Sequence, residues 1–509
     1  MPFEAAPGVV AGGRPRAIVV GGGFGGMAAA LRLRARGYAV TLHDRCDRLG
    51  GRAAVFERDG FRHDAGPTVL CAPRLFEELF ALFGRKLSDK VALLTPDPWY
   101  RFVYDDGSSF DYGPTRERTE REIARLSPRD VDGYRRLLEL SRAVHDVAFT
   151  QLSDRPFHDP LFMARQIPDL LRLHSYRTVW NVARRHFEDD RLARAFAIQP
   201  LLLGGNPVTT TSIYSLITWL EHDQGVWFPK GGTGALVDAL ADLMDEAGID
   251  IRLNSPVAEI VVEDGAARGV LLEDGRRERA DLVVSNCDPL HLYARMLPEG
   301  AAGRLPRLRL RHGQPSMGLF VLYFGARRQW PEVAHHTIQF SERFEGLLSD
   351  IFDRGRLTED LSLYLHRPTA TDPSFAPEGC DSFYVLCPVP NLRHGGIDWA
   401  AEGPRLRDAI VQKLDATLLP GLRETITSEF WMTPEDFRDR YDSAHGAGFS
   451  LQPLFRQSAF FRFHNRAEGI RDLYLVGAGT HPGAGVPGVV LSAKVLDALV
   501  PEAAEAEAL

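Results

Sequence analysis

The stretch Ala17-Ile18-Val19-Val20-Gly21-Gly22-Gly23-Phe24-Gly25-Gly26 decides the fold. Its first four residues form a short apolar run rich in β-branched side chains, which predicts a buried strand. A helical stretch, Met27 to Arg36, follows the glycines, and Gly37 is suited to end it. Ala39 to Leu42 predicts the next strand. The chain therefore opens with a βαβ unit.

The glycine spacing Gly21-x-Gly23-x-x-Gly26 predicts a dinucleotide site. Gly21 permits a tight turn, Gly23 lets the backbone approach a pyrophosphate, and Gly26 lets helix and strand pack closely. The helix N-terminus then offers free N–H groups and its positive dipole end. Asp44 follows at about the 20-residue spacing where an acid would hold a ribose hydroxyl.

Two further segments near the N-terminus could approach the same ligand. Arg48-Leu49-Gly50-Gly51-Arg52 combines paired glycines with cationic donors, which suit a phosphate. Gly66-Pro67-Thr68 is a backbone break that could pass along a flat ring, although an ordinary turn explains it equally well.

The segment 477–488 holds five glycines and two prolines, so it predicts an irregular turn that admits a planar ligand. We expect a helix from about Val489, and its N-terminal dipole would point at whatever ligand lies there. If that ligand were a flavin, the dipole would favour its reduced, anionic state. His481 within this turn could be catalytic, but a structural role is the better interpretation.

Composition narrows the class of protein. The chain has 509 residues, which suggests roughly three domains or one interrupted domain. Its 44% hydrophobic and 25% charged residues exclude a disordered chain, and its net charge of −8 argues against a nucleic-acid partner. The five scattered cysteines include no CxxC pair, which favours a reducing compartment. We expect residues 1–16 to be a short frayed arm, and the tail from Pro501 to be frayed too.

Patterns along the chain suggest three regions. The first is the βαβ opening described above. Residues 85–225 show mainly helical periodicity, and the part after Trp227 returns to short strands. The expected strands are 281–286, 318–324, 361–366, 382–386 and 473–476.

Several motifs together resemble bacterial phytoene desaturases of the carotenoid pathway, from about residue 15 to 500. They are DRLGGRA, DAGPTV, GVWFPKGGTGALVDAL (225–240), HHTI (335–338), the block 364–390 and YLVGAGTHPGAGVPGV (474–489). The N-terminal glycine motif alone is shared by a wider flavoprotein group that includes amine oxidases. The resemblance implies an α/β protein with a Rossmann-like FAD-binding domain built from non-contiguous segments, a mixed-sheet substrate domain and a helical membrane-facing part. The corresponding boundaries are 15–84, 226–300 and 441–500 for FAD, 85–225 for the helical region, and 301–440 for the substrate domain.

The resemblance also assigns cofactor residues. The FAD-binding set is Gly21, Gly23, Gly26, Asp44, Gly50, Gly51, Arg52, Gly66, Pro67, Thr68, Val257, Gly479, Thr480, Gly488 and Val489. Val257 would hold the adenine through its backbone. Asp44 stands where the family usually has Glu, and Leu491 where relatives often have Gly or Ser.

The stretch 161–186 is basic and apolar, with Arg165, Arg172, Arg177, Arg184 and Arg185 among Leu, Tyr and Trp residues. This composition suits a helix on an anionic bilayer, although an ordinary packed amphipathic helix fits as well. A weaker basic run spans residues 304–311. No stretch is long enough to span a bilayer and no secretory signal is visible. We therefore expect a cytoplasmic protein associated with the inner face of the cell membrane.

The expected reaction is desaturation of phytoene to more conjugated carotenes such as neurosporene or lycopene. A hydride would leave to the flavin, a proton would leave the neighbouring carbon, and a quinone or oxygen would accept the electrons. The sequence does not reveal the base, and Asp159 and Arg165 are the catalytic candidates although both could be surface residues. The alternatives are a carotenoid isomerase, a hydroxycarotenoid dehydrogenase, an amine oxidase and a non-enzymatic prenyl-binding protein.

We expect no metal site. His335 and His336 lack the usual ligand spacing, and the chain holds no HExxH motif.

Overall fold

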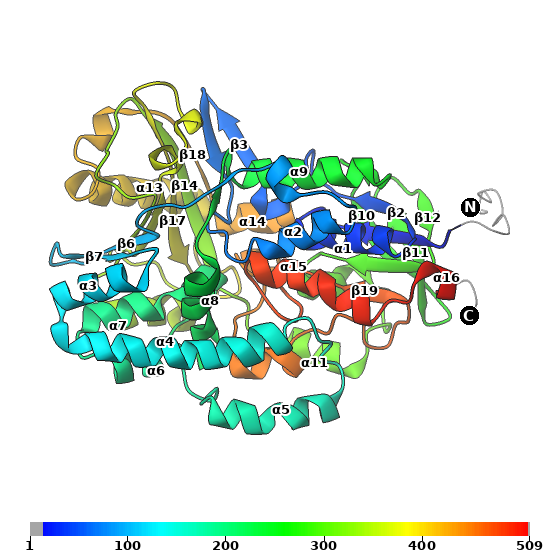
Figure 1. The fold of residues 1–509 in the computed structure, drawn as a ribbon. Coiled ribbons are helices and arrows are strands. Elements are labelled where there is room, and N and C mark those ends of the chain that lie inside the picture. Colours follow the sequence, from blue (N-terminus) through cyan, green and yellow to red (C-terminus); the bar gives the residue numbers. More distant parts are fainter. Residues whose placement is uncertain (1–13, 507–509) are drawn as a thin grey trace.

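The computed structural model describes residues 14–506, so most of the predicted N-terminal arm lies outside the described residues. Two large sheets organise the chain (Figure 1). The first has five parallel strands in the order β19-β13-β1-β2-β9. Their bounds are β1 Arg16–Val20, β2 Ala39–His43, β9 Asp250–Arg252, β13 Leu282–Ser285 and β19 Leu473–Leu475. The sheet thus joins segments that lie far apart in the sequence, as an FAD-binding fold of non-contiguous segments predicts.

The predicted βαβ opening is confirmed. β1 and β2 pair in parallel, and α1 (Phe24–Ala35) connects them. The helix begins at Phe24, three residues earlier than we expected, because Gly25 and Gly26 already belong to its first turn. Gly37 follows the helix with a φ of +99°, a conformation that suits glycine.

The second sheet is mixed and has seven strands in the order β18-β14-β17-β16-β15-β6-β7. β15 and β6 pair in parallel, and the other neighbours are antiparallel. The bounds are β6 Tyr100–Val103, β7 Ser109–Tyr112, β14 Gly318–Ala326, β15 His336–Gln339, β16 Leu363–His366, β17 Asp381–Val389 and β18 Ile426–Met432. The strands predicted at 318–324, 361–366 and 382–386 are β14, β16 and β17, and this sheet is the expected mixed sheet.

Small sheets connect the larger parts. They are the pair β3 (Val55–Arg58) and β4 (Phe61–Asp64), the pair β5 (Leu93–Leu94) and β8 (Phe228–Pro229), and the meander β10 (Val257–Glu263), β11 (Ala266–Leu272) and β12 (Arg277–Arg279). Asp264-Gly265 and Asp274-Gly275 lie at the two turns of the meander, as their turn signals predict.

Helices cover both sheets (Figure 1). Those near the five-stranded sheet are α1, α2 (Arg74–Ala81), α9 (Gly232–Glu246) and α15 (Val486–Lys494). The predicted helical region 85–225 contains α3 (Arg116–Leu126), α4 (Val131–His145), α5 (Pro160–Arg172), α6 (Val179–His186), α7 (Asp190–Ala197) and α8 (Leu216–Gln224). The remaining helices are α10 (Pro289–His291), α11 (Arg304–His312), α12 (Phe344–Ser349), α13 (Trp399–Ala416), α14 (Pro434–Tyr441) and α16 (Ala503–Ala506).

The expectation of a frayed tail from Pro501 is wrong for its described part. The backbone N–H of Ala503 donates to the carbonyl of Arg36 at 3.0 Å, and Ala503 is buried. All five cysteines are free thiols. Within residues 14–506, no helix combines the length and the apolar character needed to cross a bilayer.

Candidate active site

The parallel strands of the five-stranded sheet end at one edge, where the candidate cofactor residues gather. β1 leads into Gly21, β2 into Asp44, β13 into Asn286, and β19 into the turn at Gly477. Ligands of open α/β sheets bind in the crevice at the carboxyl ends of the strands. A cavity of about 1510 Å³ lies here, and all four of these residues line it.

The glycine motif has the geometry that dinucleotide binding requires. Gly21 has a φ of +96°, and Gly23 is the residue that precedes the first turn of α1. A Cβ at Gly26 would lie 1.9 Å from the carbonyl oxygen of Gly21, so only glycine allows this close packing. The first turn of α1 carries no acid and no side-chain cap, which leaves its N–H groups available to an anion.

The second glycine pair lies against the first motif. The N–H of Gly50 donates to the carbonyl of Gly22 at 2.9 Å, and Gly50 and Gly51 have φ angles of +105° and +55°. Both glycines and Arg52 line the cavity. Arg52 donates to Oγ of Ser443 at 2.9 Å, which orients its guanidinium beside the glycines.

Gly66, Pro67 and Thr68 also line the cavity. A Cβ at Gly66 would lie 2.6 Å from the carbonyl oxygen of Arg52, so this segment packs directly on the phosphate-side motif. Thr68 shares a short hydrogen bond of 2.5 Å with the hydroxyl of Tyr364, a second cavity residue.

Asp44 is held by two backbone N–H groups. Oδ2 accepts from Gly22 at 2.6 Å, and Oδ1 accepts from Cys46 at 2.7 Å. Burial raises the pKa of Asp44 against the lowering effect of these two bonds. A carboxylate offers about four lone-pair sites, so it can still accept from a ribose hydroxyl.

Asn286 lines the cavity beside the glycine motif and is a further candidate for the cofactor site, which the sequence did not indicate. Its side chain donates to the carbonyl of Gly21 at 3.3 Å. A Cβ at either Gly25 or Gly477 would lie 2.6 Å from its Oδ1. The sequence placed it as the last residue of the predicted strand 281–286, whereas β13 ends at Ser285 and Asn286 follows it.

The C-terminal turn is arranged differently from our expectation. Gly479 packs on Pro289, where a Cβ would lie 2.2 Å from Cδ, and Thr480 is buried and donates to the carbonyl of Gly477. Neither is among the residues that line the cavity. Both therefore lie on the side of the turn that faces away from the cavity. The cavity is lined instead by Gly477, Ala478 and residues 481, 482, 484 and 485.

The helix expected from about Val489 begins earlier, at Val486, after Gly485 with a φ of +97°. Gly488 and Val489 belong to its first turn and line the cavity, and no acid occupies this turn. The N-termini of α1 and α15 therefore both lie at the cavity. Such a pair of positive dipole ends suits an anionic, planar cofactor.

Val257, the predicted adenine contact, is the first residue of β10 and lines the cavity. His481 lines it as well, but its Nε2 pairs with the carbonyl of Leu152 at 3.3 Å, and burial lowers its pKa to about 4. The imidazole is therefore neutral, which agrees with a structural role.

The walls of the cavity are mainly apolar, and its lining also includes Met163, Gln166 and Leu170 of α5. We call this part of the cavity, away from the glycines, the channel. Its volume exceeds the roughly 300–1,000 Å³ of an ordinary ligand pocket, so it has room for a dinucleotide and a long substrate.

Glu221 of α8 is a buried acid in the wall of this channel. Its Oε1 accepts a hydrogen bond of 2.8 Å from the hydroxyl of Tyr100. Burial raises its pKa to about 8, while Tyr100 and Gln199 act in the opposite direction. Nothing in the sequence indicated this residue, because a single Glu on an amphipathic helix is usually exposed.

The two catalytic candidates from the sequence lie elsewhere. Asp159 caps the N-terminus of α5 by accepting from the N–H of Leu161 at 2.8 Å, and Arg165 is exposed on the same helix. Neither is among the cavity-lining residues, although other residues of α5 are. Their positions argue against contact with a substrate in the channel.

Comparison with known proteins places this arrangement first in a broad class. Residues 24–495 match the family model of flavin containing amine oxidoreductases. An oxidoreductase structure from Methanosarcina mazei has a TM-score of 0.63 at 17% identity and covers 95% of this chain and 99% of its own. A putrescine oxidase structure has a TM-score of 0.61 at 16% identity, with coverage of 97% and 99%. Both likenesses concern the fold.

Closer relatives narrow the class. A lycopene-forming phytoene desaturase of Pseudescherichia vulneris is 46% identical, with coverage of 96% of this chain and 99% of its own. A neurosporene-forming phytoene desaturase of Rhodobacter capsulatus is 42% identical, with coverage of 97% and 95%. The chain belongs to the flavin-containing amine oxidoreductases and, within them, to the bacterial phytoene desaturase family. It is an FAD-dependent oxidoreductase, and the glycine cradles and the two open helix N-termini fit that cofactor.

Proposed function

We propose that this protein desaturates phytoene to more conjugated carotenes, such as neurosporene or lycopene. One observation carries the proposal: the same cavity is lined by the candidate FAD-binding glycines and by mainly apolar walls that reach α5 and α8. A hydrocarbon offers no hydrogen-bonding group, so an apolar channel is the means of holding it against the cofactor.

The protein's own residues have two tasks in this reaction. Bound FAD supplies a two-electron acceptor for the hydride that leaves an allylic carbon. The channel orients that carbon and excludes water, and a base must take the proton from the neighbouring carbon as the new double bond forms. Glu221 is the buried acid in the wall, and we assign it this proton. We propose Glu221 in place of Asp159 and Arg165.

The surface around α5 supports delivery of the substrate from a membrane. No residue of α5 is buried, and Leu161, Ile167 and Leu171 expose 67, 48 and 58% of their surface. Leu305 and Leu308 of α11 add exposed apolar surface at 44 and 53%. Figure 1 shows α5 at the edge of the molecule, with α11 above it.

The same surface carries cations that would attract anionic lipids. They are Arg165 and Arg172 on α5 and Arg304, Arg307 and Arg311 on α11. A basic helix with an apolar face is typical of an interfacial anchor. We propose that α5 and α11 rest on the cytoplasmic face of the membrane, so that phytoene enters the channel beside α5. A quinone in the same membrane, or oxygen, would then accept the electrons.

The decisive experiment uses the FAD-loaded protein with phytoene in liposomes without oxygen. We expect the absorption band of oxidised flavin to bleach and chromatography to show carotenes with additional double bonds. A quinone or oxygen should restore the band.

Other outcomes would support the alternatives. Geometric isomers without desaturation would indicate an isomerase, and turnover only with hydroxylated carotenoids would indicate a hydroxycarotenoid dehydrogenase. Bleaching by simple amines alone would indicate an amine oxidase. A purified protein unable to bind FAD would indicate a prenyl-binding protein.

A further inference from the structure

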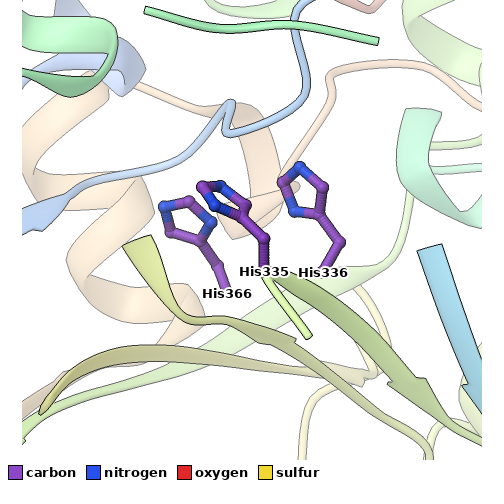
Figure 2. A group of neighbouring side chains, drawn as sticks. All are labelled: His335, His336 and His366. Carbon is purple, nitrogen blue, oxygen red and sulfur yellow. The ribbon is translucent and has the colours of Figure 1, made fainter. Parts of the chain in front are cut away.

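Three histidines that the cofactor site does not use lie together in the interior. His335 directly precedes β15, His336 begins it, and His366 ends the neighbouring strand β16. His336 and His366 are register partners across the two antiparallel strands, so their side chains are direct neighbours on one face of the sheet. Figure 2 shows the three imidazole rings side by side above the strands. The sequence did not indicate this group, because His366 is distant from His335 and His336 in the chain.

The three rings approach closely. The ring centroids of His335 and His336 are 4.4 Å apart, and those of His335 and His366 are 4.7 Å apart. One ring nitrogen from each histidine can be chosen so that all three lie within 4.8 Å of one another. All three side chains are buried.

Each imidazole has one nitrogen near an orienting group. Nδ1 of His335 pairs with Oγ1 of Thr371 at 2.6 Å, and Nδ1 of His336 pairs with the hydroxyl of Tyr364 at 2.7 Å. Nε2 of His366 faces Oδ2 of Asp64 at 3.6 Å.

The remaining ring nitrogens are buried without a hydrogen bond among residues 14–506. They are Nε2 of His335, Nε2 of His336 and both nitrogens of His366, whose Nε2 lies too far from Asp64 for a hydrogen bond. Buried polar atoms are nearly always paired, so this group requires an explanation. His335 and His336 show the division that is typical of metal-binding histidines, in which one nitrogen binds the metal and the other is held by a hydroxyl, carbonyl or carboxylate.

A carboxylate lies beside the histidines. Asp64 supplies a negative charge, with Oδ1 held by the N–H and hydroxyl of Thr233 at 3.0 and 2.8 Å. The neighbouring cation, Arg367, is paired with Asp381 at 2.9 Å.

We propose that His335, His336 and His366 form a binding site for a divalent transition-metal ion such as Zn²⁺, with Asp64 orienting His366. Tetrahedral Zn²⁺ with bonds of about 2.0–2.1 Å needs nitrogens roughly 3.4 Å apart, so the rings close slightly around the ion. A water molecule fills the fourth position. The site links β15, β16 and, through Asp64, the hairpin β3–β4, so its role is structural.

The site also adjoins the cavity. The hydroxyl of Tyr364 contacts His336 on one side and Thr68 on the other, and both Tyr364 and Thr68 line the cavity. An ion bound to His336 would thus fix the position of Tyr364 in the cavity wall.

The test measures zinc in the full-length protein, produced with a purification tag that contains no histidine. After loading with ZnCl₂ and desalting, we expect about one Zn²⁺ per chain by mass spectrometry. His336→Gln and His366→Gln should each reduce the retained zinc by about tenfold or more. His394→Gln changes an exposed histidine and serves as the matched control, with zinc content unchanged.

Two further measurements keep the proposal falsifiable if the variants fold poorly. Zn²⁺ should raise the melting temperature of the chelator-treated wild-type protein, and Co²⁺ should produce ligand-field absorption at longer wavelengths than the flavin bands. Wild-type protein that retains no metal and shows neither effect would overturn the proposal and leave a buried water as the occupant. Equal zinc in wild type and both folded variants would overturn it as well. None of these readouts depends on desaturase activity.

Discussion

The hydroxyl of Tyr100 on β6 donates a hydrogen bond of 2.8 Å to Oε1 of Glu221 on α8. Both residues line the cavity and both are buried. The pair places a carboxyl with a strongly raised pKa in an apolar channel, the setting in which proteins prepare an acid–base group.

Replacing this carboxyl tests its proposed role in proton removal. The wild-type rate should rise with pH through about 8, because Glu221 must lose its proton before it can accept one. Glu221→Gln should lower kcat by about 100-fold or more and remove this dependence. Single-turnover flavin bleaching across pH checks both. An unchanged pH profile in the variant would exclude Glu221 as the base.

The same carboxyl should affect stability. Its pKa is raised from 4.5 to about 8 in the folded protein, so the folded state binds the proton more tightly than the unfolded state. The stabilising contribution is therefore complete below about pH 4.5 and is lost as the pH rises through about 8. Urea unfolding should show the wild type losing a few kcal/mol relative to Glu221→Gln over this interval. Glu188→Gln, at a side chain that is 73% exposed, should follow the wild type.

Gly23→Val should abolish retention of FAD. A Cβ at this position already lies 3.1 Å from Nδ2 of Asn286, and the valine methyl groups would occupy the space at the N-terminus of α1. The ratio of flavin to protein absorbance after gel filtration measures the effect. Gly346→Val, on α12 and beside the flexible Arg343, is the control. A folded Gly23→Val protein with full flavin content would contradict the assigned pyrophosphate loop.

Asp44→Ala should weaken FAD binding by about 1–3 kcal/mol, the range for loss of a charged hydrogen-bond partner. Asp44→Asn keeps an oxygen that can accept from one of the two backbone N–H groups, so we expect a smaller loss. Titration of the apoprotein with FAD gives the dissociation constants. Equal affinities for both variants and the wild type would remove Asp44 from the site.

Binding to anionic liposomes should depend on the cations of α5 and α11. Changing Arg165, Arg172, Arg304, Arg307 and Arg311 to Gln should weaken binding by about 1 kcal/mol per charge and reduce its salt sensitivity. Flotation assays measure the bound fraction. A control with Arg276, Arg405 and Arg423 changed to Gln alters charges on other elements and should bind normally. Equal liposome binding by the wild type and both variants would contradict a role of these cations in membrane binding.

Local motifs predicted the FAD-binding half of the molecule well. The strand, glycine loop and helix from Ala17 to Ala35 are contiguous, and their chemistry is set by backbone conformation at Gly21, Gly23 and Gly26. The strands β14 and β17 were also foreseeable, because each contains an apolar run, whereas the mixed sheet was implied by the family resemblance.

Features that depend on tertiary packing were not predictable. Glu221 looks like a surface residue until the cavity surrounds it, and Gly479 and Thr480 share a motif with cavity residues yet lie behind them. His366 joins His335 and His336 only because β15 and β16 pair in this register. In each case the decisive neighbour comes from a distant part of the chain.

The helix α5 faces the cavity with Met163, Gln166 and Leu170 and exposes Leu161, Ile167 and Leu171 outward. If α5 rests on the membrane, this single helix would separate the lipid, in which the carotene is dissolved, from the cavity. On the proposed function, the quantity that saturates the enzyme is the mole fraction of carotene in the bilayer. Diluting the lipid phase at constant total phytoene should thus alter the rate, whereas diluting the surrounding water should not.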